Sequence, residues 1–220
     1  MKLPVFIFES VFSIELVLPD GQVRHCSREH EKELFYATCG GMGLTGIILS
    51  ACFKLQRVNS AYMQQKTLRA RNLKEIFSLF EEYEEWPYSV AWIDCMAKGE
   101  NQGRSLLMVG YHGNDGRLDP APAGNYRVVF DFPGFCLNKY TVAAFNYIYY
   151  NRLRTNEKDE TVLIDNFFYP LDTVLDWNRM YGQNGFVQYQ FVLPIESSFE
   201  GLAKILGRIS DSGMASFLAV

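Results

Sequence analysis

The amino-acid sequence predicts an α+β fold made of antiparallel sheets with flanking helices. Short apolar runs typical of strands recur along the chain and are separated by tight turns, as in hairpins. Segments with helical spacing occur between them without a regular strand–helix–strand repeat, which argues against a parallel sheet. With 220 residues, of which 48% are hydrophobic, the chain can bury a sizeable core in one large or two smaller domains.

The first part of the chain predicts a hairpin, a short helix and a long strand. Residues 11–18 read as a strand, residues 19–21 (Pro-Asp-Gly) as the turn, and residues 22–26 as the returning strand. A short helix is expected over residues 29–37, and a long strand over residues 45–58.

The rest of the chain predicts a second mixed region. Leu73, Ile76, Phe77 and Phe80 recur at helical spacing after Asn72, a candidate N-cap. The further expected elements are strands over residues 88–96, 104–111, 162–164 and 185–193, and helices over residues 139–152, 172–180 and 197–210. Residues 112–125 are expected to form a surface loop that acts as a substrate gate or as a simple linker, and residues 155–160 a solvated charged run.

A cluster of glycines lies between the first predicted helix and the long strand. Because glycine has no Cβ, Gly40, Gly41, Gly43 and Gly46 let the backbone approach a bulky ligand, and a nucleotide cofactor is the first candidate. The G-x-G-x-x-G pattern follows a helix and precedes a strand, the reverse of a Rossmann turn, and no P-loop lysine follows. We expect residues 47–49, which follow it, to be a buried strand. The alternative is a turn that only joins a helix to a strand.

Several segments carry a family resemblance in a consistent order. They are residues 33–38, 40–48, 89–94, 138–140, 167–172, 177–179, 185–194 and 216–220. With these segments the chain resembles flavoproteins of the vanillyl-alcohol-oxidase type, in the branch of decaprenylphosphoryl-β-D-ribose oxidases and sugar-lactone oxidases. The resemblance implies part of a two-domain flavin oxidase fold. Residues 1–58 are then the C-terminal part of an FAD-binding domain, and residues 59–220 a substrate (cap) domain, incomplete at its C-terminus.

The resemblance also implies site residues. Gly43, Gly46, Ile47 and Ile48 are expected to bind FAD, with Ile48 near the adenine end. The expected substrate-pocket residues are Trp92, Phe168, Leu171, Gln188, Gln190, Leu218 and Val220. Other interpretations place Trp92 in the core, and both glutamines on the solvent face of their strand. Phe168 and Val90 depart from the family, which has a tyrosine and a serine there.

The function implied by the resemblance is FAD-dependent oxidation of a sugar-derived alcohol or lactone by hydride transfer to flavin. The family's N-terminal glycine loop and flavin-side histidine, and its pocket lysine, have no counterpart in these residues, so no catalytic residue is assigned. The alternative is a catalytically inactive fragment or scaffold that needs a separate N-terminal flavin-binding half. Self-association, or a partner chain supplying that half, is the expected consequence of an uncovered apolar face.

Composition narrows the classes of partner and compartment. The net charge of −4 leaves no basic footprint for nucleic acid. Five scattered cysteines without C-x-x-C spacing predict reduced thiols in a cytoplasmic setting and no zinc, and three histidines show no ligand spacing. Cys39, beside the glycines, is either a redox nucleophile or a small buried residue. The apolar opening at residues 3–8 is too short to span a membrane and is expected to be an edge strand; peripheral membrane association stays open.

Overall fold

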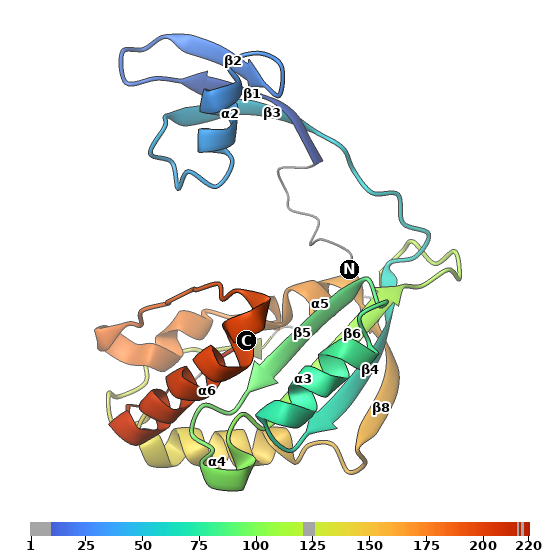
Figure 1. Cartoon of the computed structure of the whole chain (residues 1–220), viewed down its shortest axis with the longest axis vertical. Helices are drawn as coiled ribbons and strands as arrows, with labels where there is room; N and C mark the ends of the chain where they lie inside the picture. Colours follow the sequence, from blue (N-terminus) through green and yellow to red (C-terminus); the bar gives the residue numbers. More distant parts are fainter. Residues whose placement is uncertain (1–9, 121–125, 215, 217) are drawn as a thin grey trace. The chain divides into compact units, whose positions relative to one another are not determined.

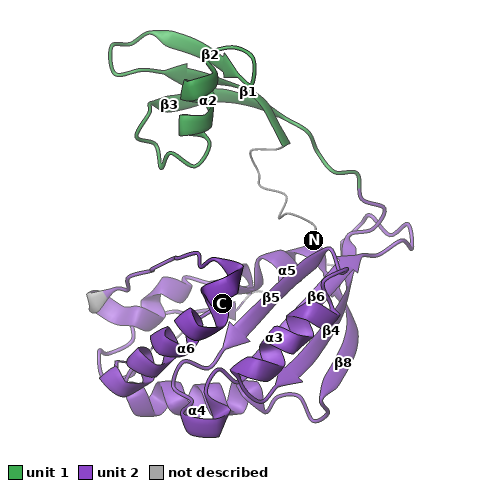
Figure 2. Cartoon of the chain, viewed as in Figure 1, with its two compact units in different colours: residues 1–57 green, residues 58–220 purple. Residues whose placement is uncertain are grey.

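The computed structural model describes residues 10–120, 126–214, 216 and 218–220 (Figure 1). The chain divides into two compact units, Met1–Arg57 and Val58–Val220 (Figure 2). The edge strand predicted at residues 3–8 lies outside the described residues. Assignment of the two units to an FAD-binding and a substrate domain stays a prediction.

The described part of the first unit, from residue 10 on, contains a three-stranded antiparallel sheet and the helix α2. Its elements are β1 (Val11–Val17), β2 (Val23–Ser27), α2 (Lys32–Thr38) and β3 (Ile47–Phe53), and the strand order is β2-β1-β3. The predicted hairpin is confirmed. Asp20 Oδ1 accepts a hydrogen bond from Gln22 N at 2.9 Å, and Gly21 has a φ of +81°, so local interactions form the turn. Buried Ile14, Cys26 and Phe35 form the core between the sheet and α2.

Strand β3 differs from its prediction. All seven of its residues are exposed, with Ile47, Ile48 and Leu49 at 71%, 52% and 57%. The expectation of a buried strand is therefore wrong for the described chain. The reason is topological, because β3 is the edge of its sheet, bonded only to β1, while α2 packs beside β2.

The second unit is built on a four-stranded antiparallel sheet. Its strands are β4 (Tyr62–Ala70), β5 (Tyr88–Ile93), β6 (Ser105–His112) and β8 (Glu157–Leu163), in the order β5-β6-β4-β8. The antiparallel α+β class is thus confirmed. Strand β4 was not predicted. Residues 155–160, which were expected to form a solvated charged run, contribute the first four residues of β8. Lys66 of β4 neutralises that run by pairing with Glu157 and Asp159 at 3.3 and 3.0 Å.

One face of this sheet is covered by α3 (Leu73–Glu82) and α6 (Ile195–Ser212), which lie side by side in Figure 1. The predicted cap is confirmed, since Asn72 Oδ1 accepts a hydrogen bond from Glu75 N at 3.1 Å. Apolar side chains of the sheet meet both helices in the main core. Its buried members are Leu68, Ala70, Leu73, Ile76, Ala91, Cys95, Leu107, Val109 and Leu206.

The opposite face of the sheet is covered at its two ends by α4 (Lys139–Tyr150) and α5 (Ile164–Phe168). Near α4, Trp92 and Leu106 of the sheet pack against Tyr150 and Leu153. Near α5, the ring of Phe167 lies against Gly110, where a Cβ would overlap the ring. We call this the α4/α5 face.

The remaining described elements are short. They are η1 (Gly99–Asn101), β7 (Tyr126–Arg127), η2 (Pro170–Thr173), β9 (Val174–Leu175) and η3 (Trp177–Asn184), with β7 and β9 paired in parallel. The helix predicted over residues 172–180 is wrong, because a short strand and two 3₁₀ segments occupy that region. The strand predicted over residues 185–193 is also wrong, since these residues form no ladder and almost all are exposed. Residues 113–120 are irregular, as expected for a loop.

Candidate cofactor and substrate sites

The glycine turn before β3 combines structural and open positions. Gly46 has a φ of +151°, and a Cβ there would overlap the carbonyl oxygen of Val17. The close approach of β1 to the start of β3 is therefore enough to require glycine at this position, without any ligand. Gly40 and Gly43 have φ values of +90° and +78°, but a Cβ on either would meet nothing within 4 Å. The backbone at these two positions therefore faces open space.

The predicted cofactor residues lie together in the first unit. Gly43 and Gly46 belong to the turn, and Ile47 and Ile48 begin β3, where Ile48 pairs with Leu16. The turn is tied to α2 by a 3.1 Å hydrogen bond between the hydroxyls of Thr38 and Thr45. Accessible backbone next to exposed aliphatic side chains fits one flat side of an adenine ring, so the residues present are compatible with this end of FAD.

Cys39, next to this turn, does not have the character of a reactive nucleophile. Burial raises the pKa of its thiol, and the nearby Arg28 only partly opposes that shift. A raised pKa keeps the group protonated near neutral pH, whereas nucleophilic cysteines need the thiolate. The structural interpretation of Cys39 is favoured.

In the second unit, the α5 end of the α4/α5 face carries an aromatic cluster around Tyr88. The ring of Phe168 lies 5.0 Å from that of Tyr88, and the ring of Phe167 lies 6.4 Å from Tyr88 and 5.1 Å from Phe168. Tyr88 Oη lies 3.3 Å from His112 Nε2, within hydrogen-bonding distance. A predicted pocket residue, Phe168, is thus placed beside two polar groups that sequence reasoning did not select.

The middle of the α4/α5 face carries a second polar group. The side-chain amide of Gln65 donates to Thr67 Oγ1 at 3.0 Å and to Glu160 Oε1 at 3.2 Å. Gln65 and Glu160 are half-buried, whereas Thr67 is fully buried. Amide and carboxylate groups beside aromatic rings suit recognition of a hydroxyl-rich ligand. These residues carried little strand signal, because β4 contains four consecutive polar residues from Gln64 to Thr67.

Trp92 lies on the same face but is not open to a ligand. Only 3% of it is exposed, and its ring lies 4.7 Å from that of Tyr149. It is a core residue beneath α4, which agrees with the alternative interpretation of this position.

The other predicted pocket residues are dispersed over the second unit. Leu171 is half-buried in η2, Gln188 and Gln190 are exposed on an irregular segment, and Leu218 and Val220 are exposed near the chain end. A hydrogen bond from Ile93 N to Ala219 O, 3.0 Å long, holds that end beside β5. Within the described part of the chain these residues do not meet in one cavity.

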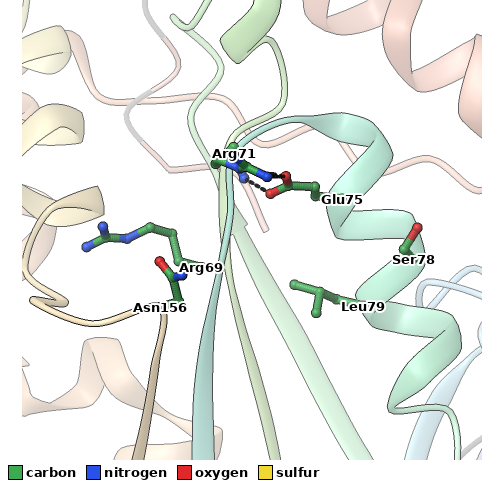
Figure 3. Close-up of a pocket in the computed structure, with 6 residues that line it drawn as sticks. All are labelled: Arg69, Arg71, Glu75, Ser78, Leu79 and Asn156. Carbon is green, nitrogen blue, oxygen red and sulfur yellow. Dashed lines mark hydrogen bonds and ion pairs between the residues drawn. The ribbon is translucent and has the colours of Figure 1, made fainter.

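A separate cavity of about 410 Å³ lies beside α3 and the end of β4 (Figure 3). It is lined by Arg69, Arg71, Glu75, Ser78, Leu79 and Asn156. Arg71 is paired with Glu75, with 2.5 Å between Nη2 and Oε1, and Figure 3 shows the Arg69 side chain pointing away from Leu79. The cavity contains none of the predicted site residues, and the guanidinium of Arg69 is directed to the Leu153 carbonyl and the Tyr150 ring.

The described ranges hold neither a candidate metal site nor a candidate membrane span. No group of His, Cys, Asp and Glu side chains there could hold a metal ion. No described helix is long and apolar enough to cross a membrane.

The sequence relationship places the chain among the FAD-linked oxidases of the vanillyl-alcohol-oxidase type. The chain is 33% identical over 225 residues to decaprenylphosphoryl-β-D-ribose oxidase of Mycolicibacterium smegmatis, a match covering 96% of this chain and 48% of that protein. The resemblance in the motifs is therefore confirmed along nearly the whole chain, which is related to about half the length of that oxidase.

Three further comparisons are less informative. An uncharacterized protein from the mprA 5′ region of Streptomyces coelicolor is 32% identical over 103 residues, covering 46% of this chain and 28% of that protein. A variant of the BBE-like 1 protein of Physcomitrella patens superposes with a TM-score of 0.40 and 16% identity, covering 73% of this chain and 30% of the other. No family model matches the chain.

Proposed function

We propose that this chain is part of an FAD-dependent oxidoreductase that oxidises a sugar-derived alcohol or lactone by hydride transfer to flavin. The observation that carries the proposal is the 33% identity, over 96% of the chain, to an oxidase named for decaprenylphosphoryl-β-D-ribose. The relationship extends through both units, so the proposal concerns both.

In this proposal the first unit holds the adenine end of FAD. The open backbone at Gly43 approaches the nucleotide, and Ile47 and Ile48 pack against it, because their side chains are exposed beside the turn. Flavin, when bound, supplies the two-electron acceptor. The contribution of this chain's own residues is to bind and orient.

The second unit, in this proposal, holds the substrate on the α4/α5 face. Phe168 and Tyr88 offer ring surface to the C–H side of a sugar, and Gln65 and Glu160 offer hydrogen-bonding groups to its hydroxyls. Gln188 and Gln190, exposed on the irregular segment 185–193, add hydrogen bonds to the ligand. Leu171, in η2 beside α5, adds apolar surface at that end of the face, Leu218 and Val220 add it separately beside edge strand β5, and Trp92 supports the face from within the core.

Flavin binding tests the proposal on the chain as it exists. Equilibrium dialysis against FAD, followed by visible absorbance, measures the flavin retained. We expect Ile48→Glu to weaken retention by at least about tenfold, since it removes an apolar contact and adds a charge near the nucleotide. Val23→Glu, on the exposed surface of β2, is the matched control and should not change it. Absence of binding by the wild-type chain at any FAD concentration would reject autonomous flavin binding.

The uncovered strand β3 favours a second candidate, in which this chain is a catalytically inactive scaffold that needs a separate flavin-binding half. A seven-residue strand with every residue exposed and several large apolar side chains is unusual for a complete domain. We expect concentration-dependent self-association in sedimentation velocity, reduced by Ile47→Ser/Leu49→Ser. A strictly monomeric wild-type chain that retains FAD would exclude this candidate.

We also propose that the protein is cytoplasmic and associates peripherally with a membrane. All five cysteines are free thiols, as expected for a reducing compartment. A substrate resembling that of the related oxidase would carry a polyprenyl chain, which resides in lipid.

A further inference from the structure

Helix α4 carries apolar side chains on its solvent face as well as on its packed face. The packed stripe consists of Val142, Asn146 and Tyr150, all buried. On the opposite side, Tyr140, Tyr147 and Ile148 are 74%, 61% and 69% exposed. We call these three residues the α4 outer face. At 3.6 residues per turn, Tyr140 and Tyr147 lie about 20° apart and Ile148 about 80–100° from them, so the three cover a broad arc of the exposed surface. A helix that is apolar on both sides normally has something covering each side.

The charges around α4 are all of one sign. Between residues 139 and 156 the charged residues are Lys139, Arg152 and Arg154, and no acid occurs. Lys139 is the first residue of the helix, and the two arginines follow its last turn. The three flanking cations are exposed, and within the described part of the chain none of them forms an ion pair with a carboxylate. The segment is therefore locally +3 in a chain of net charge −4.

Aromatic rings lie next to the cations at both ends of the helix. Lys139 Nζ lies 5.0 Å from the ring centre of Tyr140, and the Arg152 guanidinium lies 4.0 Å from that of Tyr149. Phe135, just before the helix, is also exposed, and its carbonyl accepts a 2.8 Å hydrogen bond from the Asn138 side chain that caps the helix. The α4 outer face is thus about 12 Å long, from Tyr140 to Ile148, and the helix that carries it has cations at both ends.

We propose that the α4 outer face docks on an anionic lipid surface, with the flanking cations at the headgroup phosphates. Tyrosine rings with a hydroxyl tip suit the boundary between headgroups and acyl chains, and isoleucine adds apolar area below them. The one-sign charge favours an anionic bilayer over face-to-face pairing with the α4 outer face of a second copy, because the flanking cations would repel each other in that pair and are attracted to anionic headgroups. The inference deepens the proposed peripheral association by naming its surface, and it does not depend on flavin binding.

Co-sedimentation of the full 220-residue chain with vesicles tests this inference. We expect binding to vesicles of phosphatidylcholine with phosphatidylglycerol and much weaker binding to phosphatidylcholine alone. Tyr147→Ser/Ile148→Ser should weaken binding at least about tenfold, since both side chains lose apolar burial. The matched control is Val187→Ser/Tyr189→Ser, two exposed residues on the irregular segment, which should bind like the wild type.

A charge series gives an independent readout. Lys139→Gln/Arg154→Gln should weaken binding to the anionic vesicles by roughly fivefold for each charge removed, and added salt should mimic that loss. Lys74→Gln/Arg208→Gln, which removes two exposed cations from α3 and α6, should leave binding unchanged. Circular dichroism confirms that each variant is folded.

Three results would overturn the inference. One is no binding of the wild-type chain to either vesicle. Another is equal loss of binding in the α4 variants and their matched controls. The third is a dimer in sedimentation velocity that Tyr147→Ser/Ile148→Ser abolishes, which would assign the α4 outer face to a second copy of the chain. Flavin retention is measured in parallel. Loss of vesicle binding with flavin retained would reject the docking surface alone, whereas loss of flavin binding would count against the proposed function.

Discussion

The carboxylate of Asp94 forms an ion pair with Arg104 in the interior of the second unit. Asp94 Oδ2 lies 2.6 Å from Arg104 Nη2 and 2.8 Å from Nε, and only 1% of the Asp94 side chain is exposed. Asn146 of α4 donates to the other carboxylate oxygen at 2.7 Å. The guanidinium of Arg104 also lies 5.0 Å from the ring centre of Tyr150. This cluster joins the end of β5 to α4, so it fixes the helix on the α4/α5 face.

Removal of Arg104 should destabilise this unit strongly. Arg104→Met leaves the Asp94 carboxylate buried without its partner, and we expect the free energy of unfolding to fall by about 3–5 kcal/mol. The measurement is urea unfolding followed by tryptophan fluorescence, since Trp92 lies beneath the same helix. Arg208→Met, on the exposed side of α6, should change stability by less than about 0.5 kcal/mol. A similar small change in both variants would mean that the ion pair contributes little.

The two glycines of the turn before β3 should respond differently to alanine. Both have positive φ, which costs an alanine roughly 1–2 kcal/mol, but only at Gly46 would the Cβ also overlap the Val17 carbonyl. We therefore expect Gly46→Ala to lower the unfolding midpoint of the first unit clearly more than Gly43→Ala. Hydrogen exchange of the β1 and β3 amides would report the difference. Equal effects would show that the β1–β3 approach is not tight at Gly46.

The cysteines should differ in reactivity toward thiol reagents. Burial, with the adjacent Asp94 charge as a smaller cause, raises the pKa of the Cys95 thiol to about 11, so almost no thiolate exists near neutral pH. Cys52 is exposed on β3. With a chromogenic disulfide reagent at neutral pH, we expect Cys52 to react rapidly and Cys95 only after unfolding in denaturant. The variants Cys52→Ser and Cys95→Ser assign the two phases. Rapid loss of a thiol in native Cys52→Ser that disappears when Cys95→Ser is added would contradict the buried position.

Acid should weaken the segment around Asp115. Hydrogen bonding to Ser60, followed by the interaction with Arg117, lowers the pKa of the Asp115 carboxyl to about 2. A depressed pKa in the folded state means that the stabilisation is fully present above the unfolded value of about 4 and is lost as pH falls toward about 2. The melting temperature of Asp115→Asn should therefore fall less steeply than that of the wild type as the pH decreases over this range. The control is Asp119→Asn, four residues along, which should keep the wild-type slope. Equal slopes in all three proteins would argue against the shift.

The elements predicted well are those formed by interactions between near neighbours. The Asp20–Gly21 turn closes through contacts within five residues, and Asn72 caps α3 through a residue three positions on. The helix over residues 139–152 was also recognised, and it occupies Lys139–Tyr150. The glycine cluster indicated a turn for the same reason, because a positive φ is a local preference of glycine.

The candidate substrate site was predicted less well, because its composition depends on pairing across the sheet. Strand β4 does not alternate polar and apolar residues and has Thr67 as its single β-branched residue, so its strand signal was weak. Gln65 and Glu160 meet only because β4 pairs with β8, whose residues lie about 95 positions later in the chain. Trp92 could not be placed in the core or at a pocket wall until α4 was known to cover it.

The sequence by itself determined the antiparallel α+β class, the hairpin and helix caps, the glycine turn and the relationship to an FAD-linked oxidase. These depend on local backbone preferences and on motifs read in order along the chain. The tertiary structure alone decided that β4 is an inner strand, that β3 is an exposed edge and that α4 presents an apolar face to solvent. Such outcomes depend on which distant segments pair and which surfaces remain uncovered, and burial is a property of that arrangement and not of a residue's own chemistry.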